Sequence, residues 1–536
     1  MKKLILIFFL VLTTCFTPAQ SQDNKTPEYP SLYIAQWVYS CSQALYPAFI
    51  NEGAPQQYAI HLAAQSCSCV IDKFRKNFLW IEVQTMRLED RSLFSENDSP
   101  TLVMGCDPRY GNDLTLSPGS FTHTLISTLN KLGVNTLSYD EFIPTPVISW
   151  AIPYYKYDGG MILTASHNPP NYNGIKFNQK NGAPASEAIT QKIETKANDY
   201  FNSPYTLPET AKGSHSIHSA PWDQFSTHLI QSCNKLGLTI PEQFSKSLSI
   251  DVKHGSCGSL WKHLSKKLKL TIQLNHSQPL ATFGNIEPNP TKYEHLSNPQ
   301  ANDYASVGND PDGDRHAVKA ENGLVISPEY LTSIIINHLC TYAKKPSALA
   351  STVASSQLLK NVCQAHDITY YETAVGFKYF TPYFEQDLSE SCLGVESSGG
   401  FSINHHTFEK CGFLPILLLV IICETTKKSL TQLKEAIDST YGHFFFTETE
   451  YHYEPEKKET LQQNLKTWTQ AELSQKLKTP ITQIIKKDGL KIITESGWIL
   501  CRLSGTEPMA RIYSESTSAQ ESKHLNQAFK SFLSKS

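Results

Sequence analysis

Three aspartates occupy alternate positions in the stretch GNDPDGDRHAV. The segment is expected to be extended, so Asp310, Asp312 and Asp314 would direct their carboxylates to one side. Three hard oxygen ligands of this kind suit Mg²⁺ or Ca²⁺. An EF-hand is a weaker interpretation, although Glu321 falls at the twelfth loop position. Arg315 stands where such a loop needs glycine, and the flanks read as strands rather than helices. A solvated acidic turn is the remaining alternative.

The stretch TASHNPPNYNGIKF holds Ser166 in a stiff setting. Pro169 and Pro170 fix the backbone φ angle, and Gly174 lets the chain reverse so that Lys176 can return toward Ser166. A held serine beside a cation suits nucleophilic or phosphoryl chemistry. The stretch does not match the G-x-S-x-G elbow of hydrolases. Read alone, such a turn is more often structural than catalytic.

Two further polar loops carry groups that suit sugars or phosphates. In GVESSGG, Glu396 and Ser398 could accept from and donate to sugar hydroxyls, while the paired glycines allow close approach. This signal is weak alone, because Gly-Ser turns are common. The stretch RLSGTEPMARIY offers arginine forks and successive backbone N–H groups, which could form a phosphate cradle; a β-turn with surface arginines is the alternative. The cradle residues would be Arg502, Ser504, Gly505, Thr506 and Arg511.

The loops follow apolar runs that read as strands, and helical patterns separate these runs. The runs include TLVMGCDPR, VNTLSY and CLGVESSGGFSI, and helices are predicted around 58–74 and over 118–132, 186–201, 328–343, 355–365 and 413–426. This alternation predicts an α/β fold with sheets covered on both faces, and the last unit reads as a smaller α+β domain. Ligands gather at the carboxyl ends of strands in open α/β sheets, so the loops are candidates for one site.

Shifts in composition divide the chain into segments. Residues 202–222 are rich in Ser, Pro, His and Thr, and residues 447–460 are highly charged, so both stretches predict linkers. The very apolar helix at 413–426 is too short and too embedded to predict a membrane span. The resulting units are 1–19, 20–205 with the serine loop, 215–322 with the aspartate loop, 323–446 with the GVESSGG loop, and 460–536 with the arginine loop.

Length and charge limit the class of protein. The chain has 536 residues and a formal net charge of -3, which predicts three or four domains and argues against a dedicated nucleic-acid binder. Lys2 and Lys3 precede a short apolar run and small residues, a pattern typical of a secretory signal over residues 1–19. A short anchor or a wrongly chosen start is the alternative. The 13 cysteines do not settle the compartment.

Taken together, the loops resemble the α-D-phosphohexomutase family, which includes phosphoglucomutases and phosphomannomutases. The matching stretches, in order, are TASHNPPNYNGIKF, DVKHGSCG, NDPDGDRHAV, TAVGFK, GVESSGG and RLSGTEPMARIY, and the resemblance covers roughly 100–515. It implies three mixed α/β domains around a central cleft and a smaller C-terminal α+β domain. The implied partner is a small-molecule sugar phosphate, without nucleic acid and without a stable membrane span in the mature chain.

The resemblance also implies a mechanism. A phosphoserine would donate its phosphoryl group to a sugar monophosphate and recover it from the resulting hexose 1,6-bisphosphate, which would serve as activator, with Mg²⁺ held beside it. The implied catalytic residues are Ser166, Lys176, His167 and Arg315; the implied metal ligands are Ser166, Asp310, Asp312 and Asp314; and the implied substrate contacts are Arg109, Lys378, Glu396, Ser398, Arg502, Ser504, Gly505, Thr506 and Arg511.

The motif details favour interconversion of glucose 1-phosphate and glucose 6-phosphate, with a phosphomannomutase or dual-specificity mutase as the alternative. Two features depart from the family pattern: residues 20–60 contain no T-S-G-x-R-G-type loop, and Cys411 stands where the family commonly carries aspartate. These departures leave open an inactive sugar-phosphate-binding or secreted interaction protein. The family is ordinarily cytoplasmic whereas residues 1–19 suggest export, so the location stays open, as does the oligomeric state.

Overall fold

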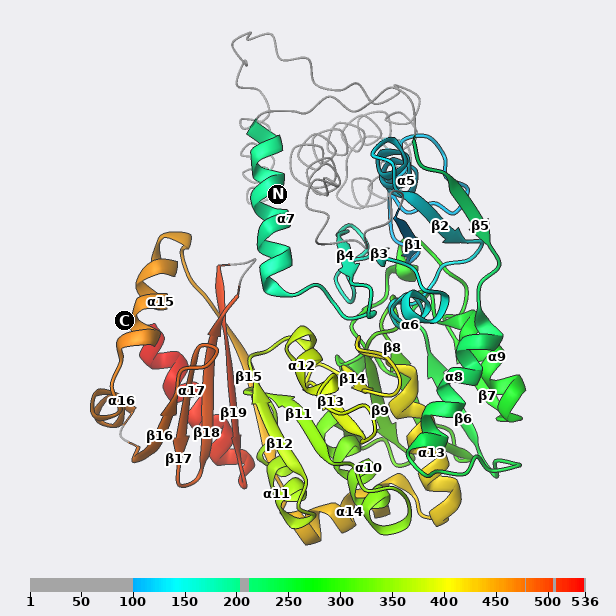
Figure 1. The fold of residues 1–536 in the computed structure, drawn as a ribbon. Coiled ribbons are helices and arrows are strands. Elements are labelled where there is room, and N and C mark those ends of the chain that lie inside the picture. Colours follow the sequence, from blue (N-terminus) through cyan, green and yellow to red (C-terminus); the bar gives the residue numbers. More distant parts are fainter. Residues whose placement is uncertain (1–99, 203–211, 478, 505–507, 535–536) are drawn as a thin grey trace, which may run out of the picture.

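The structure is a computed structural model that describes residues 100–202, 212–477, 479–504 and 508–534 (Figure 1). The export signal, the helix near 58–74 and the missing N-terminal loop therefore lie outside the described residues, as do Gly505 and Thr506. Within the described ranges, no helix combines the length and the apolarity needed to cross a membrane.

The first sheet is organised around β1 and has the strand order β4-β3-β1-β2-β5. Its strands are β1 Thr101–Cys106, β2 Asn135–Tyr139, β3 Gly159–Leu163, β4 Ile175–Asn178 and β5 His215–His218. β1 pairs in parallel with β2 and β3, and β3 returns as the antiparallel β4. Alternate residues of β1 enter different cores: Leu102 packs with Leu125 of α5 (Phe121–Lys131), whereas Val103 packs with Ile148 of α6 (Thr145–Tyr155). Both faces of this sheet are therefore covered, as the apolar run predicted.

The second and third sheets repeat this plan. The second has the order β10-β9-β8-β6-β7 and the third the order β12-β11-β13-β14. Their strands are β6 Ser247–Asp251, β7 Ile272–Asn275, β8 Asp303–Asn309, β9 His316–Ala320, β10 Val325–Ile326, β11 Ala348–Thr352, β12 Thr369–Thr373, β13 Cys392–Val395 and β14 Phe401–Ile403. In each sheet one parallel strand turns directly into an antiparallel neighbour: β3 into β4, β8 into β9, and β13 into β14. The serine, aspartate and GVESSGG loops are these three turns.

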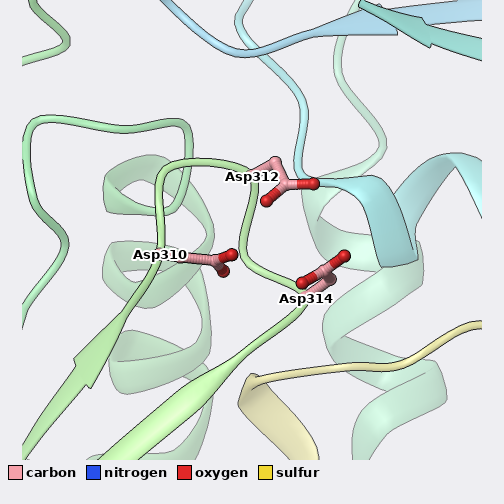
Figure 2. Close-up of side chains that lie close together, drawn as sticks. All are labelled: Asp310, Asp312 and Asp314. Carbon is pink, nitrogen blue, oxygen red and sulfur yellow. The ribbon is translucent and has the colours of Figure 1, made fainter. Parts of the chain in front are cut away.

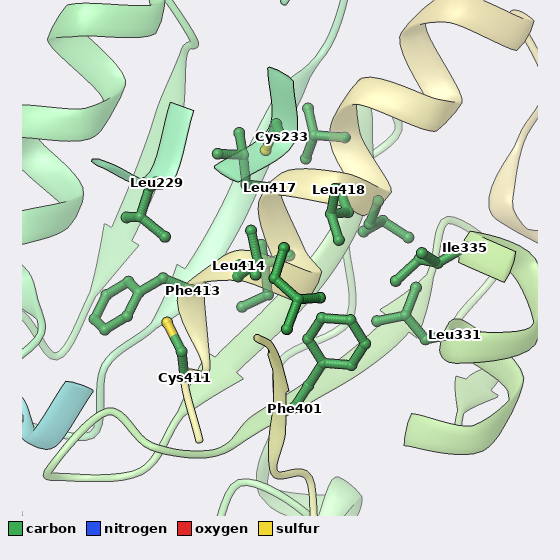
Figure 3. Packing of buried hydrophobic residues seen from close by; sticks show 14 of the residues in the cluster. Leu229, Cys233, Leu331, Ile335, Phe401, Cys411, Phe413, Leu414, Leu417 and Leu418 are labelled. Carbon is green, nitrogen blue, oxygen red and sulfur yellow. The ribbon is translucent and has the colours of Figure 1, made fainter. Parts of the chain in front are cut away.

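Helix α13 (Phe413–Thr426) lies between the second and third sheets. It contacts β8 and β9 on one side and β14 and α10 (Pro328–Tyr342) on the other. All but its last two residues are buried, which is why its sequence is apolar on every face. Figure 3 shows Phe413, Leu414, Leu417 and Leu418 of this helix packed in the core. The prediction of a buried helix at 413–426 is confirmed. The remaining helices of these units are α7 Glu187–Asn202, α8 Trp222–Lys235, α9 Gly258–Leu268, α11 Gln357–Ala365, α12 Thr381–Phe384 and α14 Leu430–Tyr441.

The C-terminal unit is an antiparallel sheet with the order β15-β19-β18-β17-β16. Its elements are β15 Phe445–His452, β16 Ile481–Ile485, β17 Leu490–Thr494, β18 Gly497–Leu503, β19 Met509–Ser516, α15 Lys458–Thr467, α16 Gln470–Leu477 and α17 Ala519–Leu533. Helix α17 packs on β15, β18 and β19, so the predicted α+β character of this unit is confirmed. The sheet lies beside β12 and β11 of the third unit (Figure 1).

Two predicted linkers contain strands, which corrects the unit boundaries. β5 lies inside 202–222 and pairs in parallel with β2, so the first sheet continues past residue 205. β15 lies inside the charged stretch 447–460 and pairs with β19 over its whole length. These edge strands expose many side chains, so they carry polar residues and read as linkers. β10 similarly extends the second sheet beyond residue 322.

Candidate active site

The three aspartates converge at the turn between β8 and β9 (Figure 2). Asp310, Asp312 and Asp314 are fully buried, and one oxygen atom from each lies within 4.8 Å of the others. Oδ1 of Asp312 and Oδ1 of Asp314 are buried without a hydrogen-bond partner. Buried carboxylate oxygens left free in this way suit a hard divalent cation such as Mg²⁺.

Neighbouring elements fix the shape of this turn. Ser256, in the loop after β6, donates both its backbone N–H and its hydroxyl to the carbonyl of Pro311 at 2.8 Å. At Gly255 a Cβ atom would lie 2.4 Å from Pro311 Cα, so only glycine allows this approach. Thr145, at the start of α6, donates its hydroxyl to Asp312 Oδ2 at 2.7 Å. The DVKHGSCG loop and the start of α6 therefore both contact the aspartate turn and fix its conformation.

Ser166 reaches the aspartates from the first sheet. Its hydroxyl donates to Asp310 Oδ2 at 2.8 Å, and its backbone N–H donates to Thr164 Oγ1 at 2.8 Å. The backbone of Ser166 is left-handed, with φ of 52°, a conformation that non-glycine residues rarely adopt outside functional turns. The structure therefore brings the predicted serine and the predicted metal ligands together.

Lys176, on β4, lies within the same cluster. Its Nζ is 2.6 Å from Oδ2 of both Asp312 and Asp314. Burial alone would lower the pKa of Lys176, but the two carboxylates raise it well above its ordinary value. For Asp314 the effects are reversed. Burial would raise its pKa, but Lys176 and other nearby cations hold the pKa well below its usual range. For Asp310, burial and the two neighbouring aspartates raise the pKa.

His167 and Arg315 border the cluster. Burial, and next the charge of Arg315, lower the pKa of His167 to about 2, so its imidazole is neutral at physiological pH. Its Nδ1 is buried without a hydrogen-bond partner. The Arg315 Nε lies 3.9 Å from both Asp310 Oδ2 and Asp314 Oδ1, and the Arg315 backbone forms a bridge with Gly400.

Glu409 and Lys410 belong to the cluster but were not among the predicted site residues. Lys410 Nζ lies 3.0 Å from Asp314 Oδ2, and the two carboxylates of Asp314 and Glu409 help to raise its pKa against the effect of burial. Burial raises the pKa of Glu409. The sequence offers no clear signal for them, because a Glu-Lys pair two residues before an apolar helix is ordinarily solvated.

The GVESSGG loop packs against this centre. Glu396 is buried, and a Cβ atom on Gly400 would lie 3.1 Å from its Oε2 and 2.7 Å from Cδ of Lys410. His316, two residues after Asp314, donates its backbone N–H to the carbonyl of Gly399 at 2.9 Å. Glu396 is thereby placed near Lys410, with Ser398 on the same partly exposed turn.

Arg502 and Arg511 lie directly opposite each other on β18 and β19. Facing like charges destabilise a sheet, so this pair is typical of a site that binds an anion. Arg502 Nε donates to Asp488 Oδ2 at 2.8 Å, and the same oxygen accepts the backbone N–H of Val375 at 2.8 Å. Val375 lies in the loop that carries Lys378, so one carboxylate joins the two loops. The backbone N–H of Ser504 donates to Met509.

Within the described part of the chain, Arg502 and Arg511 form no direct bond with Asp310, Asp312 or Asp314. The charge of Arg511 contributes to the lowered pKa of His167. The described structure therefore assembles the serine, aspartate and GVESSGG loops through contacts, and the arginine pair lies on β18 and β19 of the C-terminal unit.

Arg109 is placed differently from the expected substrate contact. It is fully buried, and its guanidinium binds Asp107 and carbonyl groups of the serine loop. Cys411 is also fully buried and packs in the core beside Phe413 (Figure 3). Its thiol therefore faces the core, although Lys410 beside it faces the aspartates.

Comparison with known proteins identifies related sequences. Models of phosphoglucomutase/phosphomannomutase alpha/beta/alpha domain I, alpha/beta/alpha domain III and C-terminal domain match residues 90–203, 327–441 and 454–531, which together make up more than half of the chain. A phosphoglucomutase/phosphomannomutase of Thermococcus kodakarensis is 25% identical over 443 residues, covering 80% of this chain and 88% of that protein. Phosphoglucomutase-1 of Homo sapiens is 27% identical over 411 residues, covering 70% of each chain.

Solved structures share the fold. A phosphoglucomutase/phosphomannomutase family protein from Burkholderia thailandensis aligns with a TM-score of 0.67 and 19% identity, over 84% of this chain and 91% of that chain. The pp63/parafusin phosphoglucomutase of Paramecium, in its open form, aligns with a TM-score of 0.65 and 21% identity, over 87% and 91%. At these identities the likeness extends to the fold alone.

Proposed function

The chain belongs to the phosphoglucomutase/phosphomannomutase family, and from that premise we propose that it is a phosphohexomutase whose phosphoryl carrier is Ser166. Its preferred reaction is the interconversion of glucose 1-phosphate and glucose 6-phosphate. The observation that carries this proposal is the hydrogen bond from Ser166 Oγ to Asp310, which joins the serine to a buried aspartate cluster. A hydrolytic serine would need a neighbouring base instead.

The reaction is a transfer between two oxygen atoms. The bond between phosphorus and Ser166 Oγ breaks as a new bond forms from phosphorus to a hydroxyl oxygen of the sugar monophosphate. The hydroxyl proton passes to a base in the site, and Ser166 Oγ takes up one proton. In the second half, the phosphoryl group at the other end of the hexose 1,6-bisphosphate returns to Ser166, so phosphate and protons balance over the cycle.

The residues around Ser166 suit this transfer. Asp310, Asp312 and Asp314 would hold Mg²⁺, which offsets charge on the transferring group. Lys176 is protonated in this arrangement, so it can donate a proton to the serine oxygen and accept one in the reverse half.

Other residues around the centre suit the substrate. His167 is neutral and would hydrogen-bond to the substrate without adding charge. Arg315 and Lys410 would neutralise phosphate oxygens beside the aspartates.

The remaining loops would bind the substrate. Glu396 and Ser398 would form hydrogen bonds with the sugar hydroxyls, and Lys378 would contact the sugar phosphate. The non-reacting phosphate would lie against Arg502, Ser504, Gly505, Thr506 and Arg511. A planar arginine fork matches phosphate geometry, and the opposed pair Arg502 and Arg511 gains a further counter-charge, beyond Asp488 and Glu448, when an anion binds.

The choice of sugar rests on the motif details, and a phosphomannomutase or dual-specificity enzyme is the second candidate. The name of the Thermococcus relative covers both activities. Competing turnover of glucose 1-phosphate and mannose 1-phosphate would rank them through the ratio of kcat/KM values.

The test uses the purified full chain. Peptide mass spectrometry should find phosphate on Ser166, and glucose 1-phosphate should be converted to glucose 6-phosphate when Mg²⁺ and glucose 1,6-bisphosphate are present. Ser166→Ala should abolish turnover, whereas Ser531→Ala, on the exposed face of α17, should keep it. Absence of both the phosphate and turnover would refute the enzyme and favour an inactive sugar-phosphate-binding protein. Full activity of Ser166→Ala would refute the assigned role.

A further inference from the structure

Arg109 lies beneath the serine loop, and its guanidinium is surrounded by backbone carbonyl groups. Nη1 donates to the carbonyls of Asn168, Pro169 and Tyr172 at 3.4, 3.3 and 2.7 Å. Nη2 donates to the carbonyl of Ser166 at 2.6 Å. Converging carbonyl dipoles repel one another, so a loop of this shape needs one group with several donors. The planar guanidinium supplies five N–H groups in a fixed fork.

The guanidinium is itself held by a buried carboxylate. Asp107 accepts from Arg109 Nε at 2.9 Å and from Nη2 at 2.8 Å, and both side chains are fully buried. Asp107 also accepts the hydroxyl of Thr164 at 2.8 Å, and that hydroxyl oxygen in turn accepts the backbone N–H of Ser166 at 2.8 Å. Ser166 is therefore held through its carbonyl by Arg109 and through its N–H by Thr164.

These two hydrogen bonds fix Ser166 in an unfavourable backbone conformation. Ser166 has a φ of 52°, in the left-handed region where a Cβ atom crowds the following carbonyl. Such a residue keeps its conformation only when its surroundings over-determine it. In this conformation the Ser166 hydroxyl points at Asp310, so the orientation of the proposed phosphoryl carrier depends on the bonds to Arg109 and Thr164.

The second unit also contacts Arg109. The guanidinium carbon lies 5.2 Å from the ring centroid of Phe283, and Phe283 is fully buried in the unit that carries the aspartate turn. Arg109 thus contacts both the serine loop of the first unit and Phe283 of the second unit, the two units that the Ser166 to Asp310 hydrogen bond joins. A fully buried arginine with these partners has no face left for a substrate.

We infer that Arg109 is a positioning residue, which locks the serine loop so that Ser166 Oγ faces the aspartate cluster, and that it does not contact the substrate. The inference rests on the proposed function, since it assigns a role within the same reaction. Its distinguishing consequence is an effect on kcat rather than on KM, because a misplaced reacting atom slows the chemical step while the phosphate and sugar contacts remain.

The first test is Arg109→Lys, measured by steady-state kinetics on the full chain. Lysine keeps the charge opposite Asp107 but loses the fork. We expect kcat to fall about 100-fold, as for a reacting group displaced by about 1 Å, with KM for glucose 1-phosphate changed less than about threefold. Arg511→Lys is the contrast, because a substrate contact should raise KM. In Arg109→Ala, added guanidinium should restore part of the lost kcat. A raised KM with unchanged kcat in Arg109→Lys would overturn the inference.

A second pair of variants covers the case in which Arg109 variants fail to fold. Thr164→Val keeps the shape of the side chain but removes the hydroxyl that binds Asp107 and the Ser166 N–H, so kcat should again fall about 100-fold. Thr164→Ser keeps the hydroxyl and should recover most of that loss. Equal rates for the two Thr164 variants would overturn the inference. An inactive wild-type chain would instead refute the proposed function, so the two failures are distinguishable.

Discussion

Cys411 offers a direct test of how burial controls charge beside the active site. The resemblance leads one to expect aspartate here, yet the thiol is fully buried against the start of α13. Burial raises the pKa of the Cys411 thiol from 9.0 to about 12, even though the backbone N–H groups of Leu414 and Phe413 act to lower it. The perturbation is Cys411→Asp, which places a carboxylate where the thiol now lies.

The expected cost follows from that pKa. A tenfold change in proton affinity is worth about 1.4 kcal/mol, so the site disfavours a negative charge by roughly 4 kcal/mol. The same environment would raise the pKa of an aspartate from about 3.9 to about 7. Because the folded-state pKa is raised, the cost is small below pH 4 and grows as pH rises. We expect destabilisation of roughly 1.5 kcal/mol at pH 5 and roughly 4 kcal/mol at pH 8.

The matched control is Cys411→Asn, which has the same shape and can accept the same N–H groups but carries no charge. Urea unfolding of both variants between pH 5 and pH 8 gives the difference in the free energy of unfolding, and changes common to both variants cancel. The difference between Asp and Asn should grow by roughly 2.5 kcal/mol over this range.

A different result would refute this reasoning. If the aspartate variant were as stable as the asparagine variant at pH 8, then capping of α13 and its helix dipole would outweigh the cost of burial. The same outcome would show that this chain tolerates the family's usual residue, and that its cysteine is not imposed by the surrounding core.

Three further predictions concern other charged residues. Burial raises the pKa of Glu329 to about 7, so Glu329→Gln should gain stability over wild type by roughly 1 kcal/mol at pH 5 and roughly 3 kcal/mol at pH 8, measured by urea unfolding. Arg511→Gln should raise KM for the sugar phosphate about tenfold or more, because a charged hydrogen bond contributes about 1.5–3 kcal/mol. Its melting temperature should change little, because removal of the like charge opposite Arg502 offsets the loss of the half-exposed ion pair with Glu448. Asp314→Asn should raise the Mg²⁺ concentration needed for half-maximal rate and lower stability by about 3 kcal/mol, because Lys410 loses its buried partner; an unchanged Mg²⁺ titration would contradict the assigned ligand.

Most elements could be predicted from the sequence where a long run of residues is apolar. The helix at 413–426 and the strand–turn–strand around the aspartates are examples, because each buries nearly every residue. β15 was missed because an exposed edge strand rich in Glu and Thr lacks an apolar signal. Lys410 was missed for another reason: a lysine that follows a glutamate is ordinarily a solvated pair, and only its 3.0 Å approach to Asp314 distinguishes it.

By itself, the sequence determined the kinds of chemical groups in the loops and their order, since the stiff serine turn and the alternating aspartates are local features. Tertiary structure alone decided which way each group faces. Arg109 and Cys411 show this, because both occupy loops that resemble functional motifs and both turn inward. The physical reason is that burial and pairing depend on residues far along the chain: Arg109 is held by carbonyls about sixty residues away, and Ser166 meets an aspartate that lies 144 residues further on.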